Sequence, residues 1–225
     1  MRLCYKPLDI LVDFDEHPIV EMVVEDPDYF AKTLFDLYEA FDAAEGQWVA
    51  SIDAKPATLD KNLYTINDYY FMLNPSKSRT VSNALFKQVV ACAQNADHIE
   101  RTQELLALVE QYGLGLVEEL GFDFEVSTDE SFDVSALIKA LGLRIFLNTE
   151  NLVARTIEFC DVLQALTGIN HFVLVNVAAL MGVDNLAALI REMGYHDHRA
   201  LLLSSVQAPC SVPQRIIVSE DLAVL

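Results

Sequence analysis

The sequence contains only four cysteines, and none of them lies close to another. They are far apart and form no C-x-x-C pair: Cys4, Cys92, Cys160 and Cys210. In a chain of 225 residues, this pattern indicates reduced, mostly buried thiols in a cytosolic protein rather than a disulfide framework.

Long uninterrupted apolar runs are also missing. The N-terminal stretch MRLCYKPLDILVDFDEH has no apolar core of the kind found in signal peptides. The most apolar run, Phe172–Val183, is too short to span a bilayer and contains Asn176. We therefore expect a cytoplasmic protein that makes no membrane contact.

The glycine loops that bind phosphate are absent as well. The sequence has no G-x-x-x-x-G-K-[ST] and no G-x-G-x-x-G, and the only closely spaced glycines, Gly113 and Gly115, fall inside an expected helix. Nucleotide binding requires backbone N–H groups of a strand-to-helix turn that point at the phosphate. We therefore expect no bound nucleotide and no nucleotide hydrolysis.

One window of this acidic chain contains no acidic residue. The formal net charge is -19, yet residues 69–96 hold Lys77, Arg79 and Lys87 with no carboxylate to offset them. A helix with three positive charges is commonly a solvated face, but the missing acid over this window favours an anion-binding surface. The overall charge argues against loose nucleic-acid binding, although oligomer symmetry can still build a locally basic surface.

Acidic residues gather just after this window. Seven carboxylates fall within sixteen residues: Glu118, Glu119, Asp123, Glu125, Asp129, Glu130 and Asp133. Hard cations such as calcium prefer several oxygen ligands, but the spacing does not match an EF-hand loop. A solvated acidic turn is the alternative. A magnesium nuclease site has less support, because no lysine or histidine base lies nearby in the sequence.

The histidines of His196-Asp197-His198 are the other metal-ligand candidates. No cysteine or further histidine accompanies them in the sequence. Because a metal site needs more ligands than this pair supplies, we interpret the segment as a solvated loop.

The arrangement of apolar residues predicts an α/β fold. Short strands at 10–14 and 19–24 precede a helix over about 28–44, and strand–helix–strand units recur in the last third, with a short strand at 143–147. Such repeats predict a parallel sheet with helices on both faces. The expected head domain comprises residues 1–60 and 136–225.

A helical lobe over residues 61–135 is expected as an insertion in this head. Asn74-Pro75 is a helix start signal, and a second long helix is expected over about 97–120. Asp133 can cap a further helix that Gly142 ends.

Several sequence blocks occur in a characteristic order. They are NPSKSRTVSNALFKQ (74–88), the acidic VEELGFDFE (117–125), LIKALGLRI (137–145), VLVNVAALM (173–181) and the ending RIIVSEDLAVL. Together they resemble the small CRISPR-associated adaptation protein of type II-A systems. The resemblance covers about residues 74–225 and is weak over the first 60.

The resemblance implies a head with a nucleotide-hydrolase-like parallel sheet but no P-loop, together with an inserted helical leg domain. It implies a homotetrameric ring whose basic inner face holds double-stranded DNA ends, and structural calcium ions in the leg. It also implies other CRISPR adaptation proteins as partners, namely the spacer integrase and the effector nuclease.

The same resemblance assigns roles to individual residues. The calcium region falls on Glu118, Glu119, Asp123, Glu125, Asp129 and Glu130. The residues expected to face DNA are Lys77, Arg79 and Lys87, followed by Lys61, Lys139 and Arg144.

The resulting hypothesis is a non-enzymatic DNA-binding ring that acts in the capture of new spacers. Two alternatives remain open. One is a metal-dependent nuclease that uses the acidic cluster, and the other is an acidic protein-interaction module that does not bind DNA.

Overall fold

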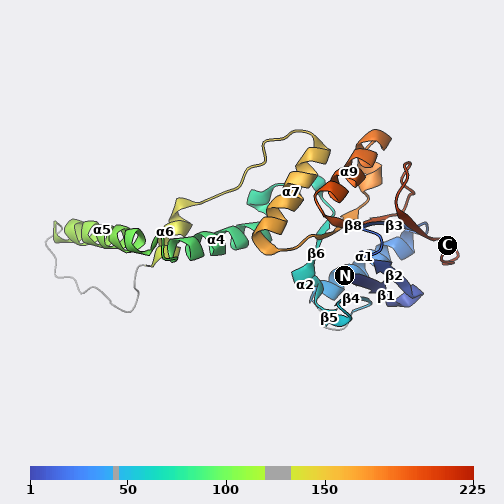
Figure 1. Ribbon diagram of the computed structural model, residues 1–225, viewed down its shortest axis with the longest axis horizontal. Helices are drawn as coiled ribbons and strands as arrows, with labels where there is room; N and C mark the ends of the chain where they lie inside the picture. The colour runs from blue at the N-terminus through green and yellow to red at the C-terminus, as the bar shows by residue number, and fades with distance from the viewer. Residues whose placement is uncertain (43–45, 120–132) are drawn as a thin grey trace. The chain divides into compact units, whose positions relative to one another are not determined.

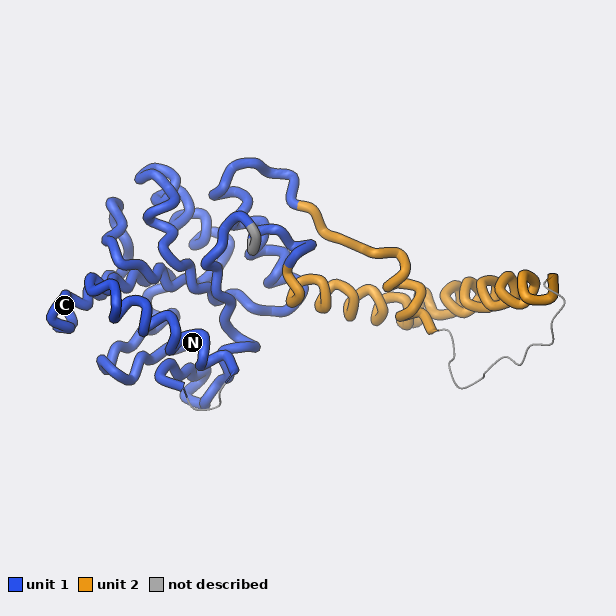
Figure 2. The backbone as a smooth tube through the Cα atoms, turned by 180° about the vertical axis from the view of Figure 1, so that it is seen from behind, with its two compact units in different colours: residues 1–77, 147–225 blue, residues 78–146 orange. Residues whose placement is uncertain are grey.

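A computed structural model describes residues 1–42, 46–119 and 133–225 of the chain. The chain divides into two compact units, which Figure 2 shows in blue and orange. Unit 1 combines residues 1–77 with 147–225, and unit 2 comprises residues 78–146. Unit 2 is therefore an insertion between the two halves of unit 1.

A five-stranded parallel sheet forms the centre of unit 1 (Figure 1). Its strand order is β6-β7-β8-β3-β9, and every neighbouring pair is parallel. The strands are β3 (Ile19–Val24), β6 (Leu63–Ile66), β7 (His171–Val175), β8 (Arg199–Ser204) and β9 (Gln214–Val218). All six residues of β3 are buried, as is typical of a central strand with both faces covered.

Three long helices accompany this sheet. They are α1 (Pro27–Asp42), α7 (Leu152–Thr167) and α9 (Val183–Tyr195). In Figure 1, α7 and α9 lie on one side of the sheet and α1 on the other. Val20 and Met22 of β3 share a core with Phe30 and Leu37 of α1. The sheet and its covering helices are the α/β arrangement that the sequence predicts.

A small antiparallel sheet in the order β2-β1-β4-β5 extends this core. Its strands are β1 (Arg2–Tyr5), β2 (Ile10–Asp13), β4 (Trp48–Ile52) and β5 (Lys55–Ala57). Trp48 is 1% exposed, and its ring lies 4.7 Å from that of Tyr5. The remaining short elements of unit 1 are η1 (Lys6–Leu8), α2 (Leu59–Asn62), α3 (Tyr69–Met72), η2 (Pro75–Lys77) and α8 (Val177–Leu180).

In its described residues, unit 2 is helical. Its helices are α4 (Arg79–Ala93), α5 (Ile99–Glu118) and α6 (Val134–Leu141). The α6 helix has the predicted cap and stop, because Asp133 accepts a 2.9 Å hydrogen bond from the Ala136 N–H and Gly142 has a φ of 59°. None of the helices in the described part of the chain is long and apolar enough to cross a membrane.

Two expectations differ from the structure. The insertion spans 78–146 rather than 61–135, because β6 pairs with β7 and so belongs to the head sheet, whereas α6 packs against α4 and so belongs to the insertion. No strand forms at 143–147, which is irregular. As expected, Gly113 and Gly115 lie inside α5, and among the described residues nothing outside the local helix backbone lies within 4 Å of the position that a Cβ would take at either glycine.

Candidate nucleic-acid interface and metal-ligating residues

The α4 and α6 helices pack against each other and form what we call the cationic helix pair. Their helical residues include Arg79, Lys87 and Lys139 but no aspartate or glutamate. Apolar side chains such as Leu85 and Ile138 line a small cavity of about 110 Å³ between the two helices. Apolar contact thus joins the helices while their cations stay exposed.

On α4, the cations follow one polar face. Lys87 comes eight residues after Arg79, which places it about 12 Å further along the helix axis and roughly 80° around it. Thr80 and Asn83 lie between them and are exposed, as are both cations. A basic face of this length can contact successive phosphates of a nucleic-acid backbone.

Lys139 and Arg144 extend the basic character of unit 2. The Lys139 Nζ lies 5.3 Å from the centroid of the Phe86 ring, a cation–π distance that ties α6 to α4. Arg144 is exposed in the irregular segment after α6. The structure therefore places four of the six predicted DNA-facing residues in unit 2.

The other two predicted residues belong to unit 1. Lys61 is exposed on α2, and Lys77 ends η2 with its Nζ 6.0 Å from the Tyr70 ring centroid. The division into two units therefore assigns these lysines to a different body from the cationic helix pair.

Several cations of unit 1 form ion pairs with carboxylates. Arg2 pairs with Asp13 at 2.7 Å, and Arg215 pairs with Glu21. Within the described residues, no ion pair involves any of these four cations of unit 2: Arg79, Lys87, Lys139 and Arg144. As far as the described residues go, an external anion can bind them without first breaking an ion pair.

The predicted calcium region is described only at its start. Glu118 is the last residue of α5 and Glu119 is its C-cap, and both are exposed. Asp123, Glu125, Asp129 and Glu130 lie outside the described residues. The last turn of α5 has no basic residue. Because a helix C-terminus carries partial negative charge, a cation there is favourable.

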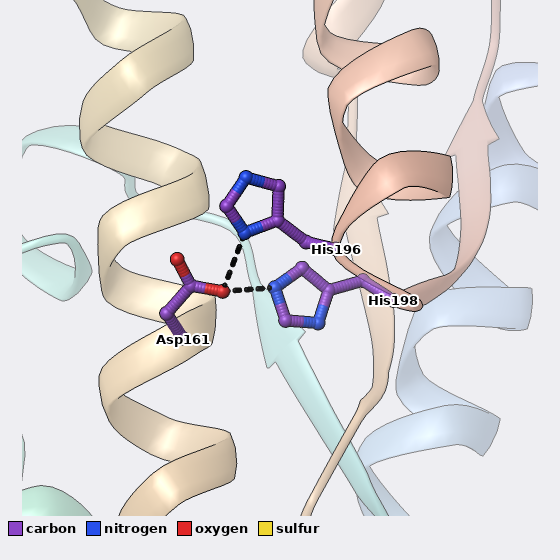
Figure 3. A group of neighbouring side chains, drawn as sticks. All are labelled: Asp161, His196 and His198. Atoms are coloured by element: carbon purple, nitrogen blue, oxygen red, sulfur yellow. Dashed lines mark hydrogen bonds and ion pairs between the residues drawn. The ribbon is translucent and has the colours of Figure 1, made fainter.

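A second polar cluster forms in unit 1, where the sequence suggested a solvated loop (Figure 3). Asp161 on α7 lies beside His196 and His198, which follow α9. The Asp161 Oδ1 is 2.9 Å from the Nδ1 of His196 and 2.9 Å from the Nε2 of His198. His198 is completely buried, so the solvated-loop interpretation is wrong for this residue.

Local geometry directs both imidazoles towards α7. Asp197 has a left-handed backbone with a φ of 58°, and the His198 N–H donates to the Met193 carbonyl at 2.9 Å. Burial lowers the pKa of His198, although its hydrogen bond with Asp161 opposes this shift. Sequence reasoning missed the cluster, because Asp161 lies 35 residues before His196.

Comparisons with known proteins identify relatives of the chain. A family model described as "CRISPR-associated protein (Cas_Csn2)" matches residues 63–222. The crystal structure of Stu0660 of Streptococcus thermophilus is similar, with a TM-score of 0.68 and 12% identity over 100% of this chain and 76% of that chain. At this identity, the likeness shows a shared fold. A comparison with curated proteins found no match.

Proposed function

Because the chain belongs to the Csn2 family of CRISPR-associated proteins, which acts in CRISPR adaptation, we propose that it binds the ends of double-stranded DNA as a homotetrameric ring. In this role it would be a non-enzymatic accessory protein of spacer acquisition. The cationic helix pair of unit 2 is the observation that carries the proposal.

The exposed cations of this pair suit phosphate contacts. Arg79 and Lys87 follow one face of α4, and Lys139 lies on the neighbouring helix. Protein–DNA affinity depends largely on such contacts, which release counterions from the DNA. A symmetric ring repeats the pair four times around one opening, while the acidic remainder of each chain repels DNA elsewhere.

An apolar stripe on α5 supports self-association. Leu105, Leu108, Tyr112 and Leu116 recur at spacings of three and four residues, and their side chains are 46%, 62%, 69% and 47% exposed. No residue of α5 is buried among the described residues. Such a surface is typical of a protein interface, and we propose that a second copy of the chain covers it.

Calcium fits the carboxylates that follow α5. Glu118 and Glu119 supply the hard oxygen ligands that calcium prefers, and they lie at the negative end of the α5 dipole. We propose that calcium offsets the repulsion between these carboxylates and the four that follow them in the sequence, namely Asp123, Glu125, Asp129 and Glu130. Its role would be structural.

The proposed ring requires no reaction of its own. It would hold DNA for other CRISPR adaptation proteins, namely the spacer integrase and the effector nuclease. A DNA incubation with magnesium serves as the control for the nuclease alternative, and we expect no cleavage.

The first experiment compares linear DNA with covalently closed circular duplex DNA in a gel-shift assay with calcium, together with the mass from light scattering. A tetramer that binds only linear DNA supports a ring that threads onto ends. A monomer that binds both forms equally contradicts the ring.

The second experiment tests the cationic helix pair. Arg79→Glu with Lys87→Glu should abolish the gel shift at moderate salt while the light-scattering mass stays unchanged. Replacing each cation by alanine should reduce the slope of log K against log salt by about 0.9 for each phosphate that the variant no longer neutralises. The matched control is Lys55→Glu with Arg191→Glu, which changes the charge equally at exposed positions of unit 1.

The acidic interaction module remains the second candidate function. The net charge of -19 and the apolar stripe of α5 both suit a protein partner. If the wild-type protein binds neither form of DNA, this candidate takes first place.

A further inference from the structure

We propose that Asp161, His196 and His198 form a binding site for one divalent transition-metal ion, with zinc as the preferred ion. The inference concerns unit 1 alone and does not depend on DNA binding or on calcium. It is based on the convergence of the three side chains, on their chemistry, and on the groove beside them.

The three side chains already point at a common centre (Figure 3). One ligand atom from each lies within 4.8 Å of the others, and both imidazole nitrogens lie 2.9 Å from the same Asp161 oxygen. Around a tetrahedral zinc ion with bonds of about 2.0–2.1 Å, neighbouring ligand atoms are about 3.3 Å apart. The two distances from Asp161 therefore need to lengthen by only a few tenths of an ångström, while the two imidazole nitrogens, which lie within 4.8 Å of each other, close on the ion.

The fold keeps these ligands in place. His198 is fully buried, and its ring lies edge to face against Phe172 at 5.3 Å. The two imidazoles are stacked, with centroids 5.9 Å apart and planes 22° apart. Asp161 projects from the middle of α7, a helix whose N-terminus is capped by Asn151. Ligands held in this way lose little conformational entropy when a metal binds.

The ligand chemistry selects the class of ion. Two imidazoles and one carboxylate suit zinc and its first-row neighbours, whereas calcium prefers oxygen ligands alone. Within the described residues, no lysine or arginine forms an ion pair with Asp161. A dication can therefore bind this carboxylate without displacing a competing cation.

A groove gives the ion access to solvent. Asp161 and His196 help to line a depression of about 620 Å³ between α7 and α9, together with Glu158 and Glu192. One oxygen of Glu158, its Oε2, is buried without a hydrogen-bond partner. Glu158 precedes Asp161 by three residues and so lies on the same side of α7. The groove thus adds negative charge beside the site and leaves room for a water molecule as the fourth ligand.

Metal binding would tie α7 to the turn between α9 and β8. It should therefore stabilise unit 1, because a ligand that binds only the folded state shifts the unfolding equilibrium. Trp48, the only tryptophan, lies in unit 1 and reports on its unfolding.

The test is a titration of the full-length, tag-free, chelator-treated protein with Zn²⁺ in the presence of millimolar Ca²⁺. Calorimetry measures zinc binding, and Trp48 fluorescence measures the melting temperature. It uses a Cys92→Ser background, since an exposed thiol such as that of Cys92 can also bind zinc. We expect one zinc ion per chain and a raised melting temperature. Co²⁺ should give visible absorption typical of four-coordinate geometry.

The variants Asp161→Asn and His196→Ala should each weaken zinc binding by about 100-fold or more, since each removes a direct ligand. His98→Ala removes an exposed histidine of unit 2 and should change nothing. Zinc binding that is absent, or equal in wild type and both variants, would overturn the proposal. The cluster would then be a hydrogen-bonded support of the α9–β8 turn.

Discussion

The buried ion pair between Glu21 and Arg215 leads to a prediction about stability. Glu21 lies on the inner strand β3 with its side chain 1% exposed, whereas the Arg215 side chain on the edge strand β9 is 30% exposed. The Glu21 carboxylate also accepts a hydrogen bond from the Ala208 N–H, and Arg215 donates to the carbonyls of Ala208 and Cys210 at 2.9 and 3.0 Å. Removing Arg215 therefore leaves a buried charge without its partner, whereas removing the charge of Glu21 leaves a partly solvated one.

Replacing Arg215 by methionine leaves a buried carboxylate without its cation. Breaking a buried pair in this way costs about 3–5 kcal/mol of unfolding free energy. Glu21→Gln keeps an acceptor for Ala208 and leaves Arg215 partly hydrated and bonded to two carbonyls. It should therefore cost only about 2 kcal/mol, the range of a charge-assisted hydrogen bond.

Urea unfolding followed by Trp48 fluorescence measures both variants. With a slope near 2 kcal/mol per molar urea, the midpoint should fall by about 2 M for Arg215→Met and about 1 M for Glu21→Gln. Arg2→Met is the matched control, because the Arg2 side chain in the Arg2–Asp13 pair is 59% exposed. Its cost should stay within about 1 kcal/mol. A Glu21 variant less stable than the Arg215 variant would refute the argument from burial.

Two further predictions concern titration and thiol reactivity. Burial, assisted by the Met1 ammonium and Arg199, lowers the pKa of His171 to about 4. As the pH falls, the unfolded chain therefore takes up the His171 proton before the folded chain does. Acidification from pH 6.5 to 4 should lower the unfolding free energy of the wild type, followed by Trp48 fluorescence, by about 2 kcal/mol, and His171→Gln should not show this loss. Burial also raises the pKa of the Cys160 thiol. A disulfide reagent should therefore modify the exposed Cys92 in the native state and Cys160 only after unfolding. Modification of both cysteines at similar rates would contradict this prediction.

Apolar patterning was sufficient to predict the α/β class and most helices. The recurring apolar segments of the last third predicted the strand–helix–strand units that include β7, and Asp133 and Gly142 predicted both ends of α6. These features depend on local sequence, so they can be recognised without knowledge of the fold. The family resemblance followed from the order of such local blocks, and the family match confirms it.

The failures involve partners that are distant in sequence. Leu63–Ile66 is a strand only because β7, more than 100 residues later, lies beside it, whereas the equally apolar segment 143–147 has no strand partner in the described structure. The proximity of Asp161 to His198 was missed for the same reason. A site with three ligands cannot be recognised from sequence spacing when strand β7 and helix α9 separate one ligand, Asp161, from the other two.

The placement of acid along the sequence explains how so acidic a chain can present a basic surface. In unit 1, cations and carboxylates are interspersed, and the arginines at positions 2, 199 and 215 pair with carboxylates. An anion that approached them would have to replace a bond already made. Arg79 and Lys87 occur where the sequence omits acid, so no carboxylate of their own helix can pair with them. The absence of acid from α4 therefore leaves Arg79 and Lys87 available to an external phosphate.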